Sequence, residues 1–91
     1  MEEEQQLGRV PPHSEKAEQA LLVSVLTSDK AMSDVIEILA PEDFYRLRNQ
    51  EVYSAIVELV DRGERPDLVT LSEHLKSSAK LDEVGGMEYI S

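Results

Sequence analysis

The segment from Gln50 to Arg62 constrains the fold of this chain more than any other. On a helical wheel its polar side chains occupy one side and its apolar side chains cover roughly 200°, about twice the stripe of a surface helix. The apolar members are Val52, Tyr53, Ala55, Ile56, Val57, Leu59 and Val60. We therefore expect a central helix that neighbours cover on more than one flank. Gly63 is expected to end it, because glycine readily adopts the left-handed conformation at a helix C-terminus.

The composition limits what can stabilise the fold and what the chain can bind. With 91 residues it is one small domain or part of a larger protein. The absence of cysteine excludes disulfides and cysteine-based zinc sites. A formal net charge of -10 repels phosphate and disfavours sequence-independent nucleic-acid binding. The sequence has no apolar run near the ~20 residues of a membrane span and no basic signal peptide, so we expect a soluble, cytoplasmic protein without a membrane partner.

The amino-terminal part of the chain divides into two regions. Residues 1–10 are rich in Glu and Gln and are expected to form a disordered acidic tail. The helical domain is then expected to span residues 11–91. Two prolines impose an extended entry to it. Ser14 is the expected N-cap of a first helix that begins near Glu15, whose negative charge suits the first turn.

Capping and periodicity signals indicate further helices on both sides of the central segment. Ser28 or Asp29 is expected to cap a second helix over residues 30–39. Thr70 and Glu73 have the spacing of a capping box, which predicts a helix that starts there. The predicted fold class is therefore all-α, a compact head of about five or six short helices around a central helix. A single helical turn is expected at residues 81–84, and the opening of one more helix at residues 87–91.

Helical spacing assigns most large apolar side chains to a core. On the first helix the predicted core face consists of Ala17, Ala20, Leu21 and Val25. Phe44 and Tyr45 are expected to fill the gap between the second helix and the central one. The predicted structural core consists of Leu21, Val25, Val35, Ile36, Leu39, Phe44, Val52, Ile56, Leu59, Leu71 and Leu75.

Three apolar side chains of the first helix lie outside its predicted core face, namely Leu22, Val23 and Leu26. This surplus has two explanations that the sequence leaves open, either deep burial in a small bundle or an apolar patch for a partner. On the central helix, one edge is expected to need cover from a second subunit or from residues beyond this chain. The interface candidates are Leu22, Val23, Leu26, Tyr53, Val57 and Val60.

No combination of residues in the sequence predicts a catalytic, cofactor-binding or metal site. His13 and His74 lie in different segments, without a His or Cys neighbour at ligand spacing. His74 is expected to be a structural histidine. Gly85 and Gly86 are not followed by the Lys-Ser or Lys-Thr pair of a phosphate loop. We therefore expect no catalytic residues, cofactor or metal in this chain.

Five stretches, taken in order, point to a known family. They are PPHSEKAEQALL at residues 11–22, APEDFY at 40–45, VYSAIVELVDRG at 52–63, DLVTLSEHL at 67–75 and LDEVGGMEYI at 81–90. Each stretch alone is weakly specific, whereas the five in this order and spacing are specific. Together they resemble the N-terminal domain of the DnaB-family replicative DNA helicases, over the region from about Arg9 to the end.

The resemblance implies an all-helical head that is not itself the motor. In such helicases this domain forms a collar of the hexameric ring, commonly as a trimer of dimers, and receives the C-terminal domain of primase and sometimes the helicase loader. The RecA-like ATPase domain, which uses ATP and Mg and grips single-stranded DNA, lies beyond a linker. That domain and the helical hairpin that completes the N-terminal domain are expected to lie outside these residues.

The acidic composition supports an alternative hypothesis from another class. A free-standing interaction module could mimic nucleic acid or sequester a basic partner, and its binding would weaken steeply with salt. A third hypothesis, an enzyme in its own right, requires a convergent polar cleft, for which the sequence offers no residues.

Overall fold

The structure, a computed structural model, describes residues 14–82 and 84–89, and all regular secondary structure in that part is helical. The elements are α1 (Glu15–Thr27), α2 (Asp29–Ile38), the 3-10 helix η1 (Pro41–Asp43), α3 (Leu47–Asp61), α4 (Leu68–Ser77) and the 3-10 helix η2 (Met87–Tyr89). This confirms the predicted all-α class. The predicted tail at residues 1–10 lies outside the described residues. Within the described part, no helix has both the length and the apolar character needed to cross a membrane.

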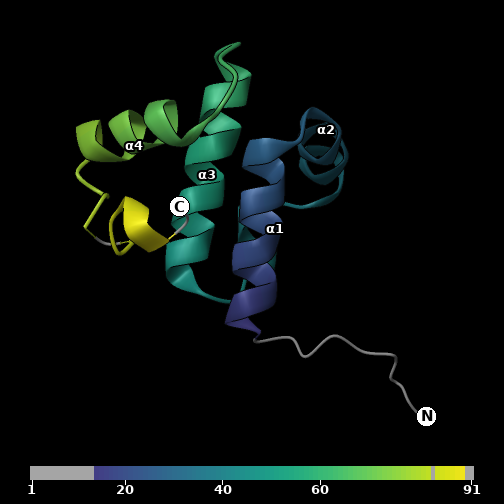
Figure 1. Ribbon diagram of the computed structural model, residues 1–91, viewed down its shortest axis with the longest axis horizontal. Coiled ribbons are helices and arrows are strands. Elements are labelled where there is room, and N and C mark those ends of the chain that lie inside the picture. Colours follow the sequence, from purple (N-terminus) through teal and green to yellow (C-terminus); the bar gives the residue numbers. More distant parts are fainter. Residues whose placement is uncertain (1–13, 83, 90–91) are drawn as a thin grey trace.

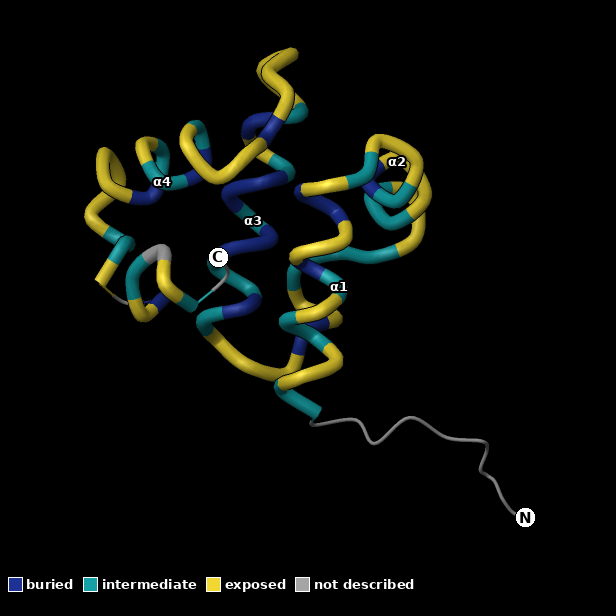
Figure 2. Tube along the Cα trace, viewed as in Figure 1, coloured by how far each residue is buried: buried dark blue, intermediate teal, exposed yellow. Residues whose placement is uncertain are grey.

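Helix α3 lies at the centre of the fold (Figure 1). Helix α1 packs beside it, α2 packs on α1, and α4 packs on the opposite flank of α3. Figure 2 shows buried residues along much of α3 and on the inward sides of α1 and α4. The central position predicted from the wide apolar arc is therefore confirmed, since α3 contacts α1, α4 and η1.

The start of α3 depends on a side chain from another helix. The helix begins at Leu47 rather than at Gln50, and its N-cap residue, Arg46, makes no side-chain capping bond. Instead the carboxylate of Glu18 on α1 accepts hydrogen bonds from the backbone N–H groups of Tyr45, at 2.6 Å, and Arg46, at 3.3 Å. A negative charge at this place also complements the helix dipole. No local capping signal could reveal it.

The end of α3 was predicted correctly. Gly63 has a φ of 80°, in the left-handed region. Its N–H donates to the carbonyl of Val60, and the N–H of Glu64 donates to the carbonyl of Leu59, both at 2.9 Å. This pair of bonds is the Schellman motif, in which the residue after the helix must adopt a positive φ.

The core face of α1 differs from the predicted one. Leu22, Val25 and Leu26 are buried, whereas Ala17 and Ala20 are exposed. The physical reason is that α1 packs against both α2 and α3, so the face that these two helices cover carries larger side chains than the predicted face. Of the two explanations left open for Leu22 and Leu26, the structure shows deep burial, so neither side chain is available as an interface candidate on the surface of this chain. Of the predicted surplus, only Val23 remains substantially exposed, at 36%.

The remaining predicted core residues line one cluster. Val25, Phe44, Val52, Ile56, Leu59, Leu71 and Leu75 are buried, and Leu21, Val35, Ile36 and Leu39 pack against them partly buried. Phe44 contacts the ring of Tyr53, with ring centroids 5.0 Å apart. The expectation that Tyr45 joins this plug is wrong, since its side chain is 56% exposed. Phe44 is in an extended conformation, in which successive side chains point in opposite directions.

At Tyr53, the edge of α3 that the sequence left without a partner meets the C-terminal end of α2. Tyr53 is fully buried, and its hydroxyl donates to the carbonyls of Leu39, at 2.8 Å, and Val35, at 3.2 Å. Burial raises the pKa of the Tyr53 phenol, with the charge of Asp43 as a smaller cause. The assignment of Tyr53 to an intersubunit surface is therefore wrong, because the tyrosine is a core residue whose hydroxyl is satisfied within the chain.

The cap of α4 lies one turn earlier than predicted. Asp67, not Thr70, is the N-cap residue: its carboxylate accepts from the Thr70 N–H at 2.9 Å, and its own N–H donates to the Thr70 hydroxyl at 2.9 Å. Aspartate is a better N-cap than threonine, which decides between the two overlapping signals. The backbone hydrogen bond from Thr70 holds the pKa of Asp67 below its ordinary value.

This depressed pKa predicts a pH dependence. Because the folded state favours the ionised carboxylate, the cap contributes its full stabilisation above the unfolded pKa of ~4 and loses it as pH falls through the lower, folded pKa. An Asp67→Asn variant should therefore differ most from the wild type at neutral pH and converge with it in acid, as measured by urea unfolding across that range. A Glu73→Gln control, outside the observed cap, should differ little from the wild type at neutral pH. A stability difference for Asp67→Asn that grows in acid would contradict the assignment.

Candidate partner-docking surface

The structure separates the six interface candidates. Leu22, Leu26 and Tyr53 lie in the core, and Val57 and Val60 are half-buried on α3. Val60 faces α2, where it lines an open groove, whereas Val23 lies on α1 and does not line that groove. The structure therefore does not assemble the predicted residues into one apolar patch.

The groove between α2 and α3, called here the α2–α3 groove, has a volume of about 400 Å³. Its α2 residues follow helical spacing and therefore share one face of that helix. The apolar lining side chains are buried or half-buried, and the polar ones are exposed. The groove is lined by Asp29, Met32, Ser33, Ile36, Glu37 and Val60. Met32, Ser33 and Glu37 were not predicted as site residues. The spacing of residues along α2 shows which of them share a face, but it does not show which helix lies against that face.

Arg65 fastens the loop before α4 to the junction of α1 and α2. Its Nε lies 2.6 Å from Oδ1 of Asp29, and its Nη2 donates to the carbonyl of Leu26 at 3.4 Å. The positive charge thereby lies near the last turn of α1, which contains no basic residue of its own, and the dipole of that helix favours it there. Because Asp29 lines the groove, this pair also connects one end of the groove to the α3–α4 loop.

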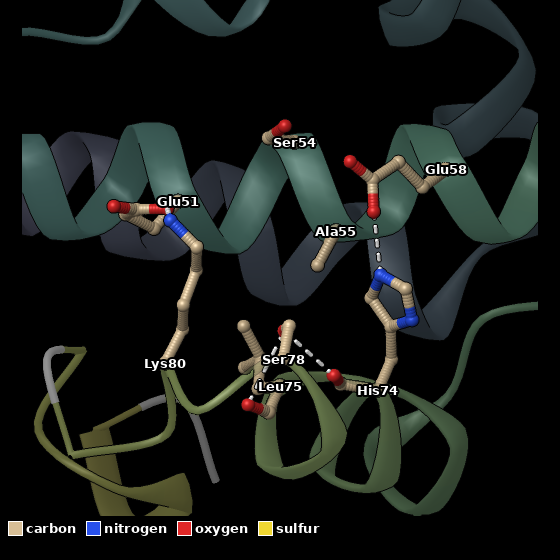
Figure 3. A pocket seen from close by; sticks show the side chains of 8 residues that line it. All are labelled: Glu51, Ser54, Ala55, Glu58, His74, Leu75, Ser78 and Lys80. Atoms are coloured by element: carbon tan, nitrogen blue, oxygen red, sulfur yellow. Dashed lines mark hydrogen bonds and ion pairs between the residues drawn. The ribbon is translucent and has the colours of Figure 1, made fainter.

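A smaller polar pocket of about 140 Å³ lies between α3 and α4 (Figure 3). Nε2 of His74 lies 2.6 Å from Oε1 of Glu58, and Nζ of Lys80 lies 2.9 Å from Oε1 of Glu51. The histidine is mostly buried against α3 and has a hydrogen-bonding partner, as expected of a structural histidine. The pocket is lined by Glu51, Ser54, Ala55, Glu58, His74, Leu75, Ser78 and Lys80.

The polar groups of this pocket connect helices rather than form a reaction centre. Each basic side chain pairs with a carboxylate of α3, and the hydroxyl of Ser78 donates to the backbone carbonyl of His74 at 2.9 Å. A nucleophile–base pair oriented by a third group, which covalent catalysis requires, is not formed by these residues. In the described part of the chain, no three His, Cys, Asp or Glu side chains converge as metal ligands.

A polar network attaches η2 to the amino-terminal ends of α1 and α3. Asn49 is fully buried; its amide donates to Glu18 at 2.7 Å and its carbonyl oxygen accepts from the hydroxyl of Tyr89 at 2.7 Å. The guanidinium of Arg48 lies 3.7 Å from the centroid of the Tyr89 ring and pairs with Glu15. The hydrogen bond that Arg48 donates to the Glu15 carboxylate is the main cause that raises the pKa of Arg48. This network was not predicted from the sequence, because Arg48 and Asn49 precede Gln50, the predicted start of the central helix.

Comparison with known proteins places the chain in a family. The family profile described as "DnaB-like helicase N terminal domain" matches residues 10–91. The "Replicative DNA helicase DnaB" of Treponema pallidum (strain Nichols) is 46% identical over 84 residues, which cover 92% of this chain and 19% of the relative. The protein of the same name from Geobacillus stearothermophilus is 46% identical over 83 residues, which cover 91% of this chain and 18% of that relative. The chain thus spans about a fifth of the length of these relatives.

A solved structure gives the same result at the level of the fold. The crystal structure of the N-terminal domain of DnaB helicase from Mycobacterium tuberculosis superposes with a TM-score of 0.81 and 43% sequence identity, covering 89% of this chain and 56% of that chain. The helical arrangement and the sequence stretches quoted above therefore agree. This chain belongs to the family of DnaB-like helicase N-terminal domains.

Proposed function

We propose that this chain is the non-catalytic N-terminal collar domain of a replicative DNA helicase, which supports assembly of the hexameric ring as a trimer of dimers and docks primase or a helicase loader during DNA replication. The observation that carries the proposal is the family match over residues 10–91. Helicase activity, ATP and Mg binding, and the grip on single-stranded DNA are assigned to an ATPase domain outside these residues. We assign residues 11–91 to the collar domain, residues 1–10 to an acidic tail, and the protein to the cytoplasm.

Two features of the structure support a role in binding proteins rather than in catalysis. In the polar pocket between α3 and α4, Lys80 forms an ion pair with Glu51, and His74 has a hydrogen-bonding partner in Glu58. The α2–α3 groove is instead lined by Met32, Ile36 and Val60 together with exposed polar residues. The formal net charge of -10 also keeps such a surface from adhering to DNA phosphates in the ring. These features suit a collar that meets protein partners.

The proposal predicts a specific binding result. The helicase that contains this chain should form hexamers in analytical ultracentrifugation, and its N-terminal part should bind the C-terminal domain of primase with an affinity that persists at high salt, because apolar contacts are not screened. The isolated chain should show no ATP turnover above background. A monomeric helicase, no binding of the primase domain, or measurable turnover by this chain would each contradict the proposal.

The net charge favours a second candidate function, a free-standing acidic module that mimics nucleic acid or sequesters a basic partner. Salt dependence separates the two candidates. Binding of a nucleic-acid-binding protein that falls by orders of magnitude between low and high salt would support the mimic, since counterion release dominates such binding.

A further inference from the structure

We propose that the α2–α3 groove docks an amphipathic helix of a partner protein, with a short apolar stripe flanked by Lys or Arg side chains. This inference rests on the proposed function, because it assigns a surface and a chemical class of ligand to the partner-docking role. The sequence motifs do not identify it, since the groove exists only where α2 meets the C-terminal half of α3.

The shape and lining of the groove suit a helix. A helix-in-groove interface uses apolar anchors at positions i, i+3 or i+4, and i+7. The groove is open, with a volume of about 400 Å³, which accommodates a few such side chains. Two of its apolar residues, Ile36 and Val60, are half-buried and so retain accessible surface, and Met32 is a flexible side chain that adapts to an incoming group.

The charges around the groove select a basic partner. Two of its lining residues, Asp29 and Glu37, are acidic, and none is basic. Asp29 forms an ion pair with Arg65, so Glu37 in the last turn of α2 supplies the exposed negative charge of the lining. Lys or Arg flanks would therefore meet a complementary surface, which selects the partner, while the apolar anchors supply the affinity that persists at high salt.

The same charges argue against a second copy of this chain as the occupant. Two copies, each with a formal net charge of -10, would place like charges against each other at a groove whose lining contains no basic residue. The observations thus favour a basic helix of a different protein.

The test uses a synthetic helical peptide with leucines at i, i+4 and i+7 and flanking lysines, and a control peptide with glutamates in place of the lysines. The lysine peptide should shift the NMR signals of the Met32, Ile36 and Val60 methyl groups, and the glutamate peptide should not. Glu37→Lys should weaken binding of the lysine peptide by about tenfold. Glu37 is exposed in the last turn of α2, where a positive charge suits the helix dipole, so the variant should stay folded.

The matched control is Glu42→Lys, which makes the same change in net charge at an exposed position of η1 that does not line the groove. It should leave peptide affinity within about twofold of the wild type. Equal weakening by both variants, equal binding of both peptides, or methyl shifts confined to other helices would overturn the inference. Self-association of the wild-type chain in the ultracentrifuge, if Glu37→Lys abolishes it, would also overturn the inference. The occupant of the groove would then be a second copy of this chain.

The primase domain separates failure of this inference from failure of the proposed function. If the wild-type chain binds the primase domain and Glu37→Lys leaves that affinity unchanged, the groove is not the docking site for primase. The proposed collar role would still stand. No binding of the primase domain, together with groove-specific binding of the lysine peptide, would overturn primase docking and support the inference.

Discussion

Replacing Leu22 with alanine should lower the free energy of unfolding by about 2–5 kcal/mol, the usual cost of deleting a fully buried leucine side chain. Leu22 is 0% exposed and belongs to the cluster that joins α1 to α3. A small domain has only about 5–15 kcal/mol of stability, so the loss is a large share of the total. Urea or thermal unfolding of the variant, followed by circular dichroism, measures it.

The neighbouring residue supplies the control. Val23→Ala removes apolar atoms from the same helix at a side chain that is 36% exposed, and it should cost less than about 1 kcal/mol. Similar losses for the two variants would contradict the observed orientation of α1. The comparison also affects how assembly is tested. A charged substitution at Leu22 or Leu26 would unfold the domain, so loss of hexamers in such a variant would report instability rather than a lost interface.

Replacing Asn49 with leucine should lower the free energy of unfolding by about 2–4 kcal/mol, because it leaves the Glu18 carboxylate and the Tyr89 hydroxyl without their buried partner. Leucine has the branching of asparagine but a larger volume, so part of this loss comes from overpacking and a second substitution is needed to isolate a hydrogen bond. The loss should affect both the start of α3 and the attachment of η2, since the amide lies between them. Equilibrium unfolding measures the total.

A double-mutant cycle with Tyr89→Phe isolates the hydrogen bond to η2. In the wild type, Tyr89→Phe should cost about 1 kcal/mol, and in the Asn49→Leu background much less, because the acceptor is already gone. Additive losses would show that the two side chains act independently and would contradict the network. Asn49 is therefore the residue outside the apolar core from which we expect the largest loss.

Much of the fold could be predicted from local patterns. Ser14 caps α1 and Gly63 ends α3 as predicted, and Ser28 caps α2, one of the two residues predicted for that cap. Each signal concerns a side chain or a backbone angle within a few residues of the helix terminus. The cap of α4 was misplaced because Asp67 and Thr70 offer overlapping signals. The early start of α3 escaped prediction for another reason, since its capping carboxylate comes from Glu18 on α1.

The candidate docking surface was less predictable. The spacing of Tyr53, Val57 and Val60 predicted an edge of α3 that needs cover, yet it did not say that Tyr53 is buried and bonded to the carbonyls of Val35 and Leu39. The α2–α3 groove is the part of this edge that α2 leaves open. The groove exists because of the distance and angle at which α2 and α3 approach each other. The periodicity of residues within either helix carries no information about that distance or angle.

The sequence by itself determined that this chain is helical, where α1 and α2 begin and α3 ends, that α3 is central, and which family the chain belongs to, because hydrophobic period, caps and motifs are local properties of the chain. Only the tertiary structure decided which face of α1 is buried, how Asn49 and Glu18 join three elements, and where an apolar groove remains. Those outcomes depend on contacts between residues far apart in the sequence. In a core this small, each helix is oriented by the neighbours that bury its largest side chains.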